Sequence, residues 1–335
     1  MDGLQDTCHC ILSLLTDGFD EKEILVWDNG SSKDDAGSLE RQFGDSIRVF
    51  RSPKNIGYAA GNNRAAGYAR SDILIFLNND TEVTKGWLDP LVSALYENKN
   101  LAACQPKLRS LVKKDYFDSA GGAGGFVDAW GYPYICGRVI STQERDDGQY
   151  DAPVDIDWAC GACIAVRKKD FLDEGGFDED FFAYLEEVDL CWKWRRRCRS
   201  IALVPKSVVY HRGGLTWRNR KHLMLYHKHR NGLLVLLKHL SCLQLMKILP
   251  LRLSLEWCAA VFYLYHGSPS QSFAPLRSFF AFFFFAPRIF RKRMQLPYPS
   301  LRRVRVLPEY FLFGKKTFSS LSSLESLHEA KQQAR

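Results

Sequence analysis

Apolar residues in the first part of the chain follow helical spacing and then strand-like spacing. The i, i+3, i+4 and i+7 positions of one helix face are occupied by Cys8, Ile11, Leu12 and Leu15. The next apolar run, 24–27, is short and stops at the turn sequence Asp-Asn-Gly-Ser. We therefore expect a helix followed by a short buried strand.

The same alternation continues over the next 50 residues. "SIRVFRS" predicts a strand, "NIGYAAGNNRAAGYAR" a helix and "DILIFLNND" another strand. This order indicates an α/β fold with a largely parallel sheet and helices on its faces. Two of the strands end at Asp28 and Asp80. We expect both carboxylates at the carboxyl edge of one sheet, where ligands bind in open α/β folds.

Further along, residues 119–150 are rich in Gly and aromatic residues, which predicts a long ordered loop region. A strand at 162–166, a helix over roughly 182–197 and a last strand ending at His211 follow. The helix is acidic in its early turns and basic at its end, which suits the helix dipole.

Charge divides the chain in two. Residues 1–215 carry 26 Lys and Arg against 34 Asp and Glu, whereas residues 216–335 carry 20 against 4. We predict one large domain over 1–215 and a basic, mainly helical region over 216–335. The basic region indicates an anionic partner, either phospholipid or nucleic acid.

Apolar helices favour the phospholipid. "RNGLLVLLKHLSCLQLMKIL" and "FFAFFFFAPRIFRKR" are both shorter than the roughly 20 uninterrupted apolar residues of a membrane span. With their basic flanks they are typical of helices that lie in the interface of an anionic membrane. A single-stranded nucleic-acid site would need exposed aromatics interleaved with basic residues. Here the aromatics cluster in runs such as 279–285, so no nucleic-acid partner is expected.

The ten cysteines are scattered. Cys160-Gly-Ala-Cys163 has the spacing of half a zinc site or a redox pair, but no second pair has comparable spacing. Ordinary buried thiols, together with the lack of a signal peptide, fit a reducing cytoplasm. We expect a cytoplasmic protein that is peripheral at the inner face of the cell membrane.

Asn78, Asn79 and Asp80 stand at the end of an apolar strand. A carboxylate beside amide oxygens suits Mg²⁺ or Mn²⁺ bound jointly with substrate phosphates. The stretch is equally consistent with a polar turn and helix cap, because Asn and Asp favour such places.

Glu186, Glu187 and Asp189 form a second acidic group. Adjacent carboxylates repel, so one of them gains a raised pKa and is suited to act as a general base. The alternative is an acidic first helical turn favoured by the dipole. His211, at a strand end, is either a structural histidine or a nitrogen ligand for a divalent metal.

In order along the chain, "VWDNGSSKDD", "NIGYAAGNN", "FLNNDTEVTKGWL", "DWACGACIAVRKKDFLDEGGFDEDFFAYLEEVDLCWKWR" and "VPKSVVYHRGG" resemble the motifs of family 2 glycosyltransferases, especially the rhamnosyltransferase-like members. The resemblance covers about residues 4–240. It implies a GT-A fold and a sugar, rhamnose among the candidates, transferred with inversion from a nucleotide diphosphate. The implied acceptor is lipid-linked or a polysaccharide, in cell-surface glycan synthesis.

The resemblance also implies roles for single residues. Asp28 would bind the base or ribose of the donor, and Asn55 and Asn63 would line the donor site. Asn78 takes the first position of the family's Asp-x-Asp metal motif and Asp80 the last, so one charge is missing.

For catalysis, the family's carboxylate falls on Glu187, flanked by Glu186 and Asp189, and His211 would complete the site of a divalent Mg or Mn ion. In the family a first strand precedes the helix that contains "LQDTCHCILSLL", whereas Met1-Asp2-Gly3 stands at that place here. We therefore expect a sheet without this strand as the sequence stands: either the true start lies upstream, or the protein lacks part of its donor site. The alternatives are a GT-A-fold binding protein with impaired catalysis, and a nucleic-acid binder through the basic region.

Overall fold

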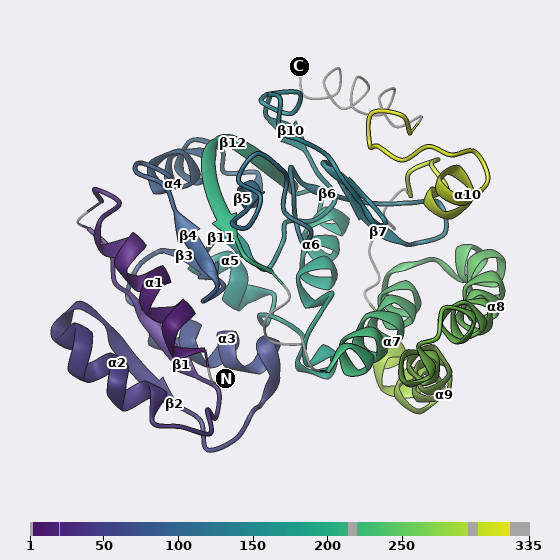
Figure 1. The fold of residues 1–335 in the computed structure, drawn as a ribbon, viewed down its shortest axis with the longest axis horizontal. Helices are drawn as coiled ribbons and strands as arrows, with labels where there is room; N and C mark the ends of the chain where they lie inside the picture. Colours follow the sequence, from purple (N-terminus) through teal and green to yellow (C-terminus); the bar gives the residue numbers. More distant parts are fainter. Residues whose placement is uncertain (1–2, 20, 214–219, 294–300, 322–335) are drawn as a thin grey trace.

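The computed structural model describes residues 3–19, 21–213, 220–293 and 301–321. A central six-stranded sheet lies between an N-terminal two-stranded sheet and a group of C-terminal helices (Figure 1). Residue 215 lies outside the described residues, so the division into 1–215 and 216–335 stays a prediction.

The central sheet has the strand order β10-β12-β5-β11-β3, and β4 also pairs with β12. Its strands are β3 (Ile73–Leu77), β4 (Thr81–Val83), β5 (Leu101–Ser110), β10 (Val154–Asp155), β11 (Cys163–Arg167) and β12 (Ser200–His211). β5 and β12 run parallel, but β11 is antiparallel to both β5 and β3, and β4 and β10 are antiparallel to β12. The sheet is therefore mixed rather than largely parallel.

Three helices pack near this sheet: α4 (Leu88–Glu97), α5 (Lys168–Asp173) and α6 (Glu186–Arg196). A short 3₁₀ turn, η2 (Glu179–Phe181), precedes α6. The predicted start of α6 at Phe182 is wrong by four residues. Phe182, Tyr184 and Leu185 have φ angles of 65°, 71° and 67°, which a right-handed helix excludes.

The region predicted as a long loop contains a four-stranded antiparallel sheet with the order β6-β7-β8-β9. Its strands are β6 (Gly125–Val127), β7 (Pro133–Ile135), β8 (Arg138–Val139) and β9 (Thr142–Gln143). Strands of two or three residues are too short to show a period of two in the sequence.

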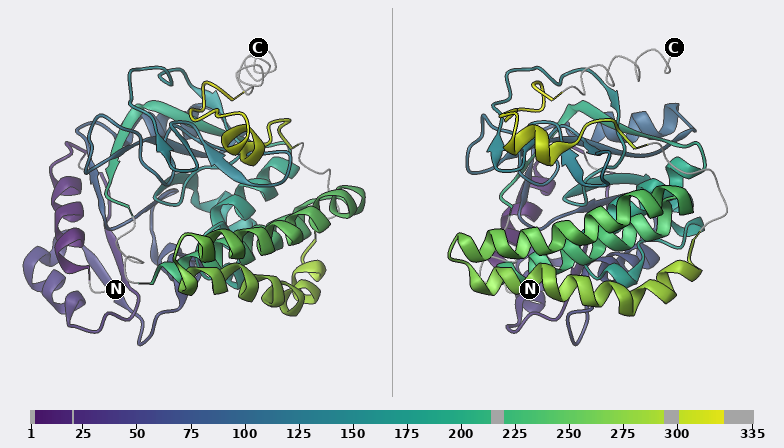
Figure 2. Two further views of the ribbon diagram at one scale, coloured as in Figure 1. Left: turned by 45° about the vertical axis from the view of Figure 1, so that its right-hand side comes forward. Right: turned by 90° about the vertical axis from the view of Figure 1, so that its right-hand side faces the viewer.

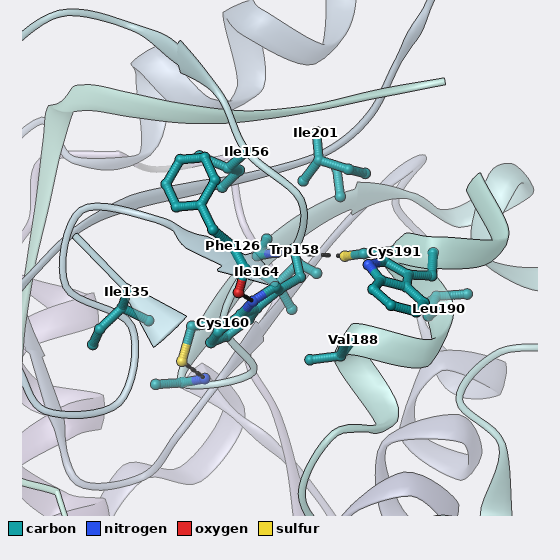
Figure 3. Close-up of a cluster of buried hydrophobic side chains, with 14 of the residues drawn as sticks. Phe126, Ile135, Ile156, Trp158, Cys160, Ile164, Val188, Leu190, Cys191 and Ile201 are labelled. Carbon is teal, nitrogen blue, oxygen red and sulfur yellow. Dashed lines mark hydrogen bonds between the residues drawn. The ribbon is translucent and has the colours of Figure 1, made fainter. Parts of the chain in front are cut away.

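The main hydrophobic core joins this small sheet to the central sheet and to α6 (Figure 3). Trp158 lies in the middle and donates a hydrogen bond from Nε1 to the carbonyl of Phe126 at 2.9 Å. Cys160 and Cys191 accept hydrogen bonds from backbone amides in the same cluster. The cysteines are free thiols, and these two fill apolar space as small side chains do.

The N-terminal elements are α1 (Leu4–Leu15), β1 (Leu25–Asp28), α2 (Asp35–Phe43), η1 (Gly44–Ser46), β2 (Arg48–Arg51) and α3 (Gly57–Tyr68). β1 and β2 pair in parallel and form a sheet of their own. The prediction of Asp28 and Asp80 on the edge of one sheet is therefore wrong. They stand at the carboxyl ends of β1 and β3, which belong to two sheets.

A slot separates these two sheets. Among the described residues β1 pairs only with β2, and β3 pairs only with β11. Residues 25–27 of β1 and 73–77 of β3 line one and the same cavity. The apolar core is divided here too, because Ile11, Leu39 and Ile47 form a small cluster of their own. The slot lies where the resemblance implies a further strand.

The C-terminal helices are α7 (Lys221–His239), α8 (Cys242–Tyr265), α9 (Pro269–Arg291) and α10 (Val306–Phe311). The first three lie side by side (Figure 2). A capping box between Ser241 and Gln244 starts α8. Residues 233–237 of α7 are buried in the main core, so α7 joins these helices to the central sheet.

Length and composition make α9 the one described helix that is long and apolar enough to cross a membrane. About 28% of its most apolar window is buried against the rest of the protein. The sequence had predicted no such helix, because the prolines and arginines of α9 interrupt its apolar runs.

The slot leads to a first prediction. α1 begins beside it, since Gly3 and Thr7 line the same cavity. An apolar five-residue strand joined before Gly3 is expected to pair with both free strand edges and to raise the melting temperature by about 5 °C, equivalent to roughly 2 kcal/mol. Differential scanning calorimetry measures this shift. The control extension carries prolines, which cannot donate to the ladder; equal melting temperatures for the two extensions would contradict the prediction.

Candidate active site

A cavity of about 1370 Å³ runs from the slot to the C-terminal helices. The predicted residues that line it are Asp28, Asn55, Asn78, Asn79, Asp80, Glu186, Glu187 and His211. They come from the ends of β1, β3 and β12, the start of α6 and the loop before α3. The fold thus brings together most of the site residues that the sequence predicted.

His211, at the end of β12, joins two carboxylates. Its Nε2 lies 3.1 Å from Oδ1 of Asp80, and its Nδ1 lies 3.0 Å from Oδ2 of Asp118. Burial works against the charged imidazolium, but the hydrogen bonds to Asp118 and Asp80 outweigh burial and raise the pKa of His211 to about 10. Burial also opposes the charge of Asp80, yet His211 lowers its pKa.

Backbone and amide groups shape the end of the cavity next to β1. Asp28 accepts hydrogen bonds from the backbone N–H and the hydroxyl of Ser31, at 3.0 and 2.7 Å. Asn29 donates to Asn55 Oδ1 at 3.1 Å and to the carbonyl of Gly57 at 2.9 Å. Gly57 has a φ of 90°, and a Cβ there would lie 2.5 Å from the carbonyl oxygen of Phe182. Only glycine lets the two loops approach so closely.

Glu186 and Glu187 occupy the first turn of α6. Burial raises the pKa of both carboxyls, and the charge of Glu187 raises that of Glu186 further. Backbone N–H groups and the ammonium of Lys228 work in the opposite direction on Glu187. Of the two carboxyls, Glu187 therefore has the surroundings that favour a negative charge more.

Asn231 of α7 supports the left-handed loop before α6. Its amide nitrogen lies 3.0, 2.9 and 2.6 Å from the carbonyl oxygens of Phe181, Ala183 and Tyr184. Arg230 adds a hydrogen bond to the carbonyl of Phe181 at 2.8 Å. Non-glycine residues with positive φ persist only where the surroundings hold them in place, and strained backbone of this kind is common at functional sites.

Asn63 does not line the cavity. Its side chain pairs with the backbone of Phe177 in both directions, donating at 2.8 Å and accepting at 2.9 Å. The amide holds α3 against the loop after α5, and the predicted contact of Asn63 with the donor stays a prediction.

Asp189 is also placed outside the cavity. It is fully buried and accepts from Lys238 and His239, both at 2.8 Å. Burial opposes its charge, but Lys238 and Lys193 hold its pKa far below the ordinary range. A carboxylate so strongly stabilised in its charged form is a poor proton acceptor.

Two candidate ligands for a divalent metal, Asp80 and His211, lie in the cavity. Among the described residues no group of three or more His, Cys, Asp and Glu side chains is arranged to hold a metal. Asp80 and His211, side by side at the cavity wall, offer one oxygen and one nitrogen. Because the pKa of His211 is raised to about 10, an ion could bind here only by displacing the proton from Nε2, and it would take its remaining ligands from phosphates and water.

The family model for Glycosyl transferase family 2 matches residues 4–171. The chain belongs to family 2 of the glycosyltransferases. The matched residues include Asp28 at the end of β1, Asn55 in the loop before α3, and Asp80 between β3 and β4.

Relatives of this family 2 glycosyltransferase act on different acceptors. The N-acetylglucosaminyl-diphospho-decaprenol L-rhamnosyltransferase of Mycobacterium tuberculosis is 27% identical over 222 residues, which cover 61% of this chain and 72% of that protein. Polypeptide N-acetylgalactosaminyltransferase 5 of Caenorhabditis elegans is 26% identical over 231 residues, covering 63% of this chain but only 36% of that protein.

A solved structure supports the fold. The crystal structure of GalNAc-T7 with UDP, GalNAc and Mn²⁺ superposes with a TM-score of 0.51 at 18% sequence identity, over 62% of this chain and 40% of that one. The predicted GT-A fold is confirmed.

Three residues of the candidate site were not predicted from the sequence. Asp118 stands alone before a Gly-rich stretch and Asn231 lies within an apolar helix, so neither has a local signal. Asn29 follows Asp28 directly at a strand end and belongs to the same polar signal.

The support of the loop by Asn231 gives the second prediction. Asn231→Asp replaces the donating amide by a carboxylate that faces three carbonyl oxygens, so we expect a loss of about 2–4 kcal/mol in the free energy of unfolding. Urea unfolding monitored by tryptophan fluorescence measures it. The control is Asn100→Asp, at an exposed position. Equal stability of the two variants would show that the loop keeps its conformation without the amide.

Proposed function

We propose that this chain is an inverting glycosyltransferase that moves a sugar from a nucleotide diphosphate to a lipid-linked or polysaccharide acceptor in cell-surface glycan synthesis. The observation that carries the proposal is that Glu187, at the start of α6, lines the same cavity as Asp80 and His211. The M. tuberculosis relative makes rhamnose the first donor sugar to test.

In the proposed reaction Glu187 accepts the proton of an acceptor hydroxyl while that oxygen attacks the anomeric carbon of the donor. The bond from that carbon to the diphosphate breaks in the same displacement, which inverts the anomeric centre. Burial and the charge of Glu187 raise the pKa of Glu186, which disfavours a second negative charge beside the attacking oxygen.

The donor half of the proposed site lies at β1 and the loop before α3, where Asp28, Asn29 and Asn55 line the cavity. Asp80 and His211 would hold a divalent ion. When bound, such an ion supplies positive charge to the leaving diphosphate.

A membrane surface is the proposed location, at the cytoplasmic face. Large apolar side chains stand exposed on α8, on α9 and directly after α10: Met246, Val261, Leu264, Tyr265, Phe273, Phe280, Phe284, Leu312 and Phe313. Lys247, Arg288 and Arg291 lie on the same helices. Exposed apolar residues flanked by cations are typical of a surface that inserts into the interface of an anionic bilayer.

Glu187→Gln separates an enzyme from a binding protein of the same fold. The amide keeps the size of the side chain but accepts no proton, so we expect transfer to fall by about 10²-fold or more while donor binding survives. Because burial raises the pKa of Glu187, the wild-type rate is expected to fall on the acid side at a higher pH than for an ordinary Glu.

The measurement begins with donor hydrolysis across a panel of nucleotide sugars with Mn²⁺ and with EDTA. Glu187→Gln, Asp189→Asn and wild type are then compared with the best donor. Near-full turnover by Glu187→Gln would reject Glu187 as the base.

The membrane proposal predicts that the double variant Phe280→Ser, Phe284→Ser loses most of its binding to liposomes that contain anionic lipid. High salt is expected to weaken the wild-type attachment as well, because it screens the basic side chains. Co-sedimentation measures both effects. Leu172→Ser, on the exposed surface of α5, is the control; equal sedimentation of all three proteins would place the contact elsewhere.

A further inference from the structure

Two basic side chains enter the cavity near Glu187. Arg138 comes from β8 and Lys228 from the middle of α7, and both line the cavity. Burial, followed by the charge of Arg138, lowers the pKa of Lys228, whereas the charge of Glu187 opposes this. The three charges are therefore close enough to interact.

Neither cation has a full set of partners. Arg138 donates from Nη1 to the carbonyl of Ser119 at 2.7 Å, but its Nε is buried without a hydrogen bond. The Nζ atom of Lys228 lies 5.1 Å from the ring centre of Tyr184. Within the described part of the chain, no carboxylate lies within 4.0 Å of either cation.

Several buried cations elsewhere in the chain contact carboxylates, whereas Arg230 and Arg252 donate to backbone carbonyls. Lys107 contacts Asp146 at 3.0 Å, Lys238 contacts carboxylates at 2.6 and 2.8 Å, and Arg302 pairs with Asp157 at 2.9 Å. Charges withdrawn from water are costly unless they are paired. Arg138 is half-buried and Lys228 is exposed, both line the cavity, and neither has a carboxylate partner among the described residues, so an anionic ligand in the cavity would meet two available cations.

The position of the pair favours the acceptor over the donor. His211 stands between Asp80 and Asp118, and Asp118 is the carboxylate whose charge acts on Arg138. Arg138 thus lies on the Asp118 side of His211, and Lys228 lies close enough to Arg138 for the two charges to interact.

The cavity wall beyond the cations contains apolar side chains beside Arg252 and His229. Leu225 of α7, Tyr263 of α8 and Leu307 of α10 line it. These helices also carry the exposed apolar residues of the proposed membrane surface, such as Leu264 and Leu312. A ligand that combines a phosphate with an apolar chain matches this arrangement.

We propose that Arg138 and Lys228 form a phosphate-binding subsite for the acceptor. It takes the phosphate or diphosphate of an isoprenoid-linked sugar and thereby brings the sugar hydroxyl to Glu187. The inference rests on the proposed function and names the acceptor class for it. Arg138 and Lys228 act as binding residues, and the proton transfer stays with Glu187.

Farnesyl diphosphate is the probe, with farnesol as its uncharged match. Calorimetry in EDTA removes binding that needs a divalent ion. Wild type is expected to bind farnesyl diphosphate and not farnesol. Lys228→Met and Arg138→Met are each expected to weaken binding about tenfold or more, since each removes a charge-assisted hydrogen bond.

The control variant is Lys221→Met, at the exposed start of the same helix, which is expected to bind as wild type does. Thermal melting shows whether each variant is folded, and Lys228→Arg should keep most of the affinity.

Binding of UDP and dTDP with Mn²⁺ separates acceptor from donor. The proposal expects both variants to keep this affinity. If the variants lose affinity for the nucleotides but bind farnesyl diphosphate as before, the cations belong to the donor phosphates and the subsite is overturned. The subsite is also overturned if the wild type does not bind farnesyl diphosphate. The binding assay needs no turnover. If the variants bind farnesyl diphosphate more weakly but the wild type transfers no sugar, the proposed function is rejected and the subsite stands.

Discussion

The contact between α7 and the loop before α6 determines where Glu187 lies. This loop turns through positive φ angles at Phe182, Tyr184 and Leu185. Its carbonyl oxygens are buried and need donors, which Asn231 and Arg230 of α7 supply. The C-terminal helices therefore complete the site, although their charge and composition differ from those of the preceding domain.

Charged groups strengthen the same contact. Lys238 of α7 lies between Asp178 and Asp189, at 2.6 and 2.8 Å, and Lys292 also reaches Asp178 at 2.6 Å. Removing one partner would leave a buried charge without compensation, which costs more than the pair itself contributes. The acidic residues beside the cavity thus divide into those that face it and those that fix α7 in place.

The sequence predicted the parts of the site that depend on local signals. Asp28, Asp80 and His211 follow apolar runs directly, so their places at strand ends could be predicted without knowing the fold. Asp189 could not be separated from Glu187 by composition, but it stands two residues further along a helix. A step of two residues turns the side chain by about 200°, away from the cavity and toward α7.

Other features depended on contacts between distant segments. The strands of β6–β9 contain only two or three residues and exist because the small sheet packs on the main core. Asn63 was assigned to the donor from its motif, yet its partner, Phe177, lies 114 residues away. The exposed face of α8 and α9 was predicted only as an apolar and basic region, because the side of a helix that stays uncovered is decided by its neighbours.

The slot between β1 and β3 also has a consequence for stability within the molecule. With a small apolar cluster of its own and no strand ladder to the central sheet, the β1–β2 region forms a separate cooperative unit. Its amides are expected to exchange hydrogen through local openings, at a lower free energy than those of β5 and β12. Asp28 and Asn29 stand on this unit, so a nucleotide that binds them shifts the local equilibrium toward the closed form. Part of its binding free energy is then used to order the protein, and the measured affinity for the nucleotide falls by that amount.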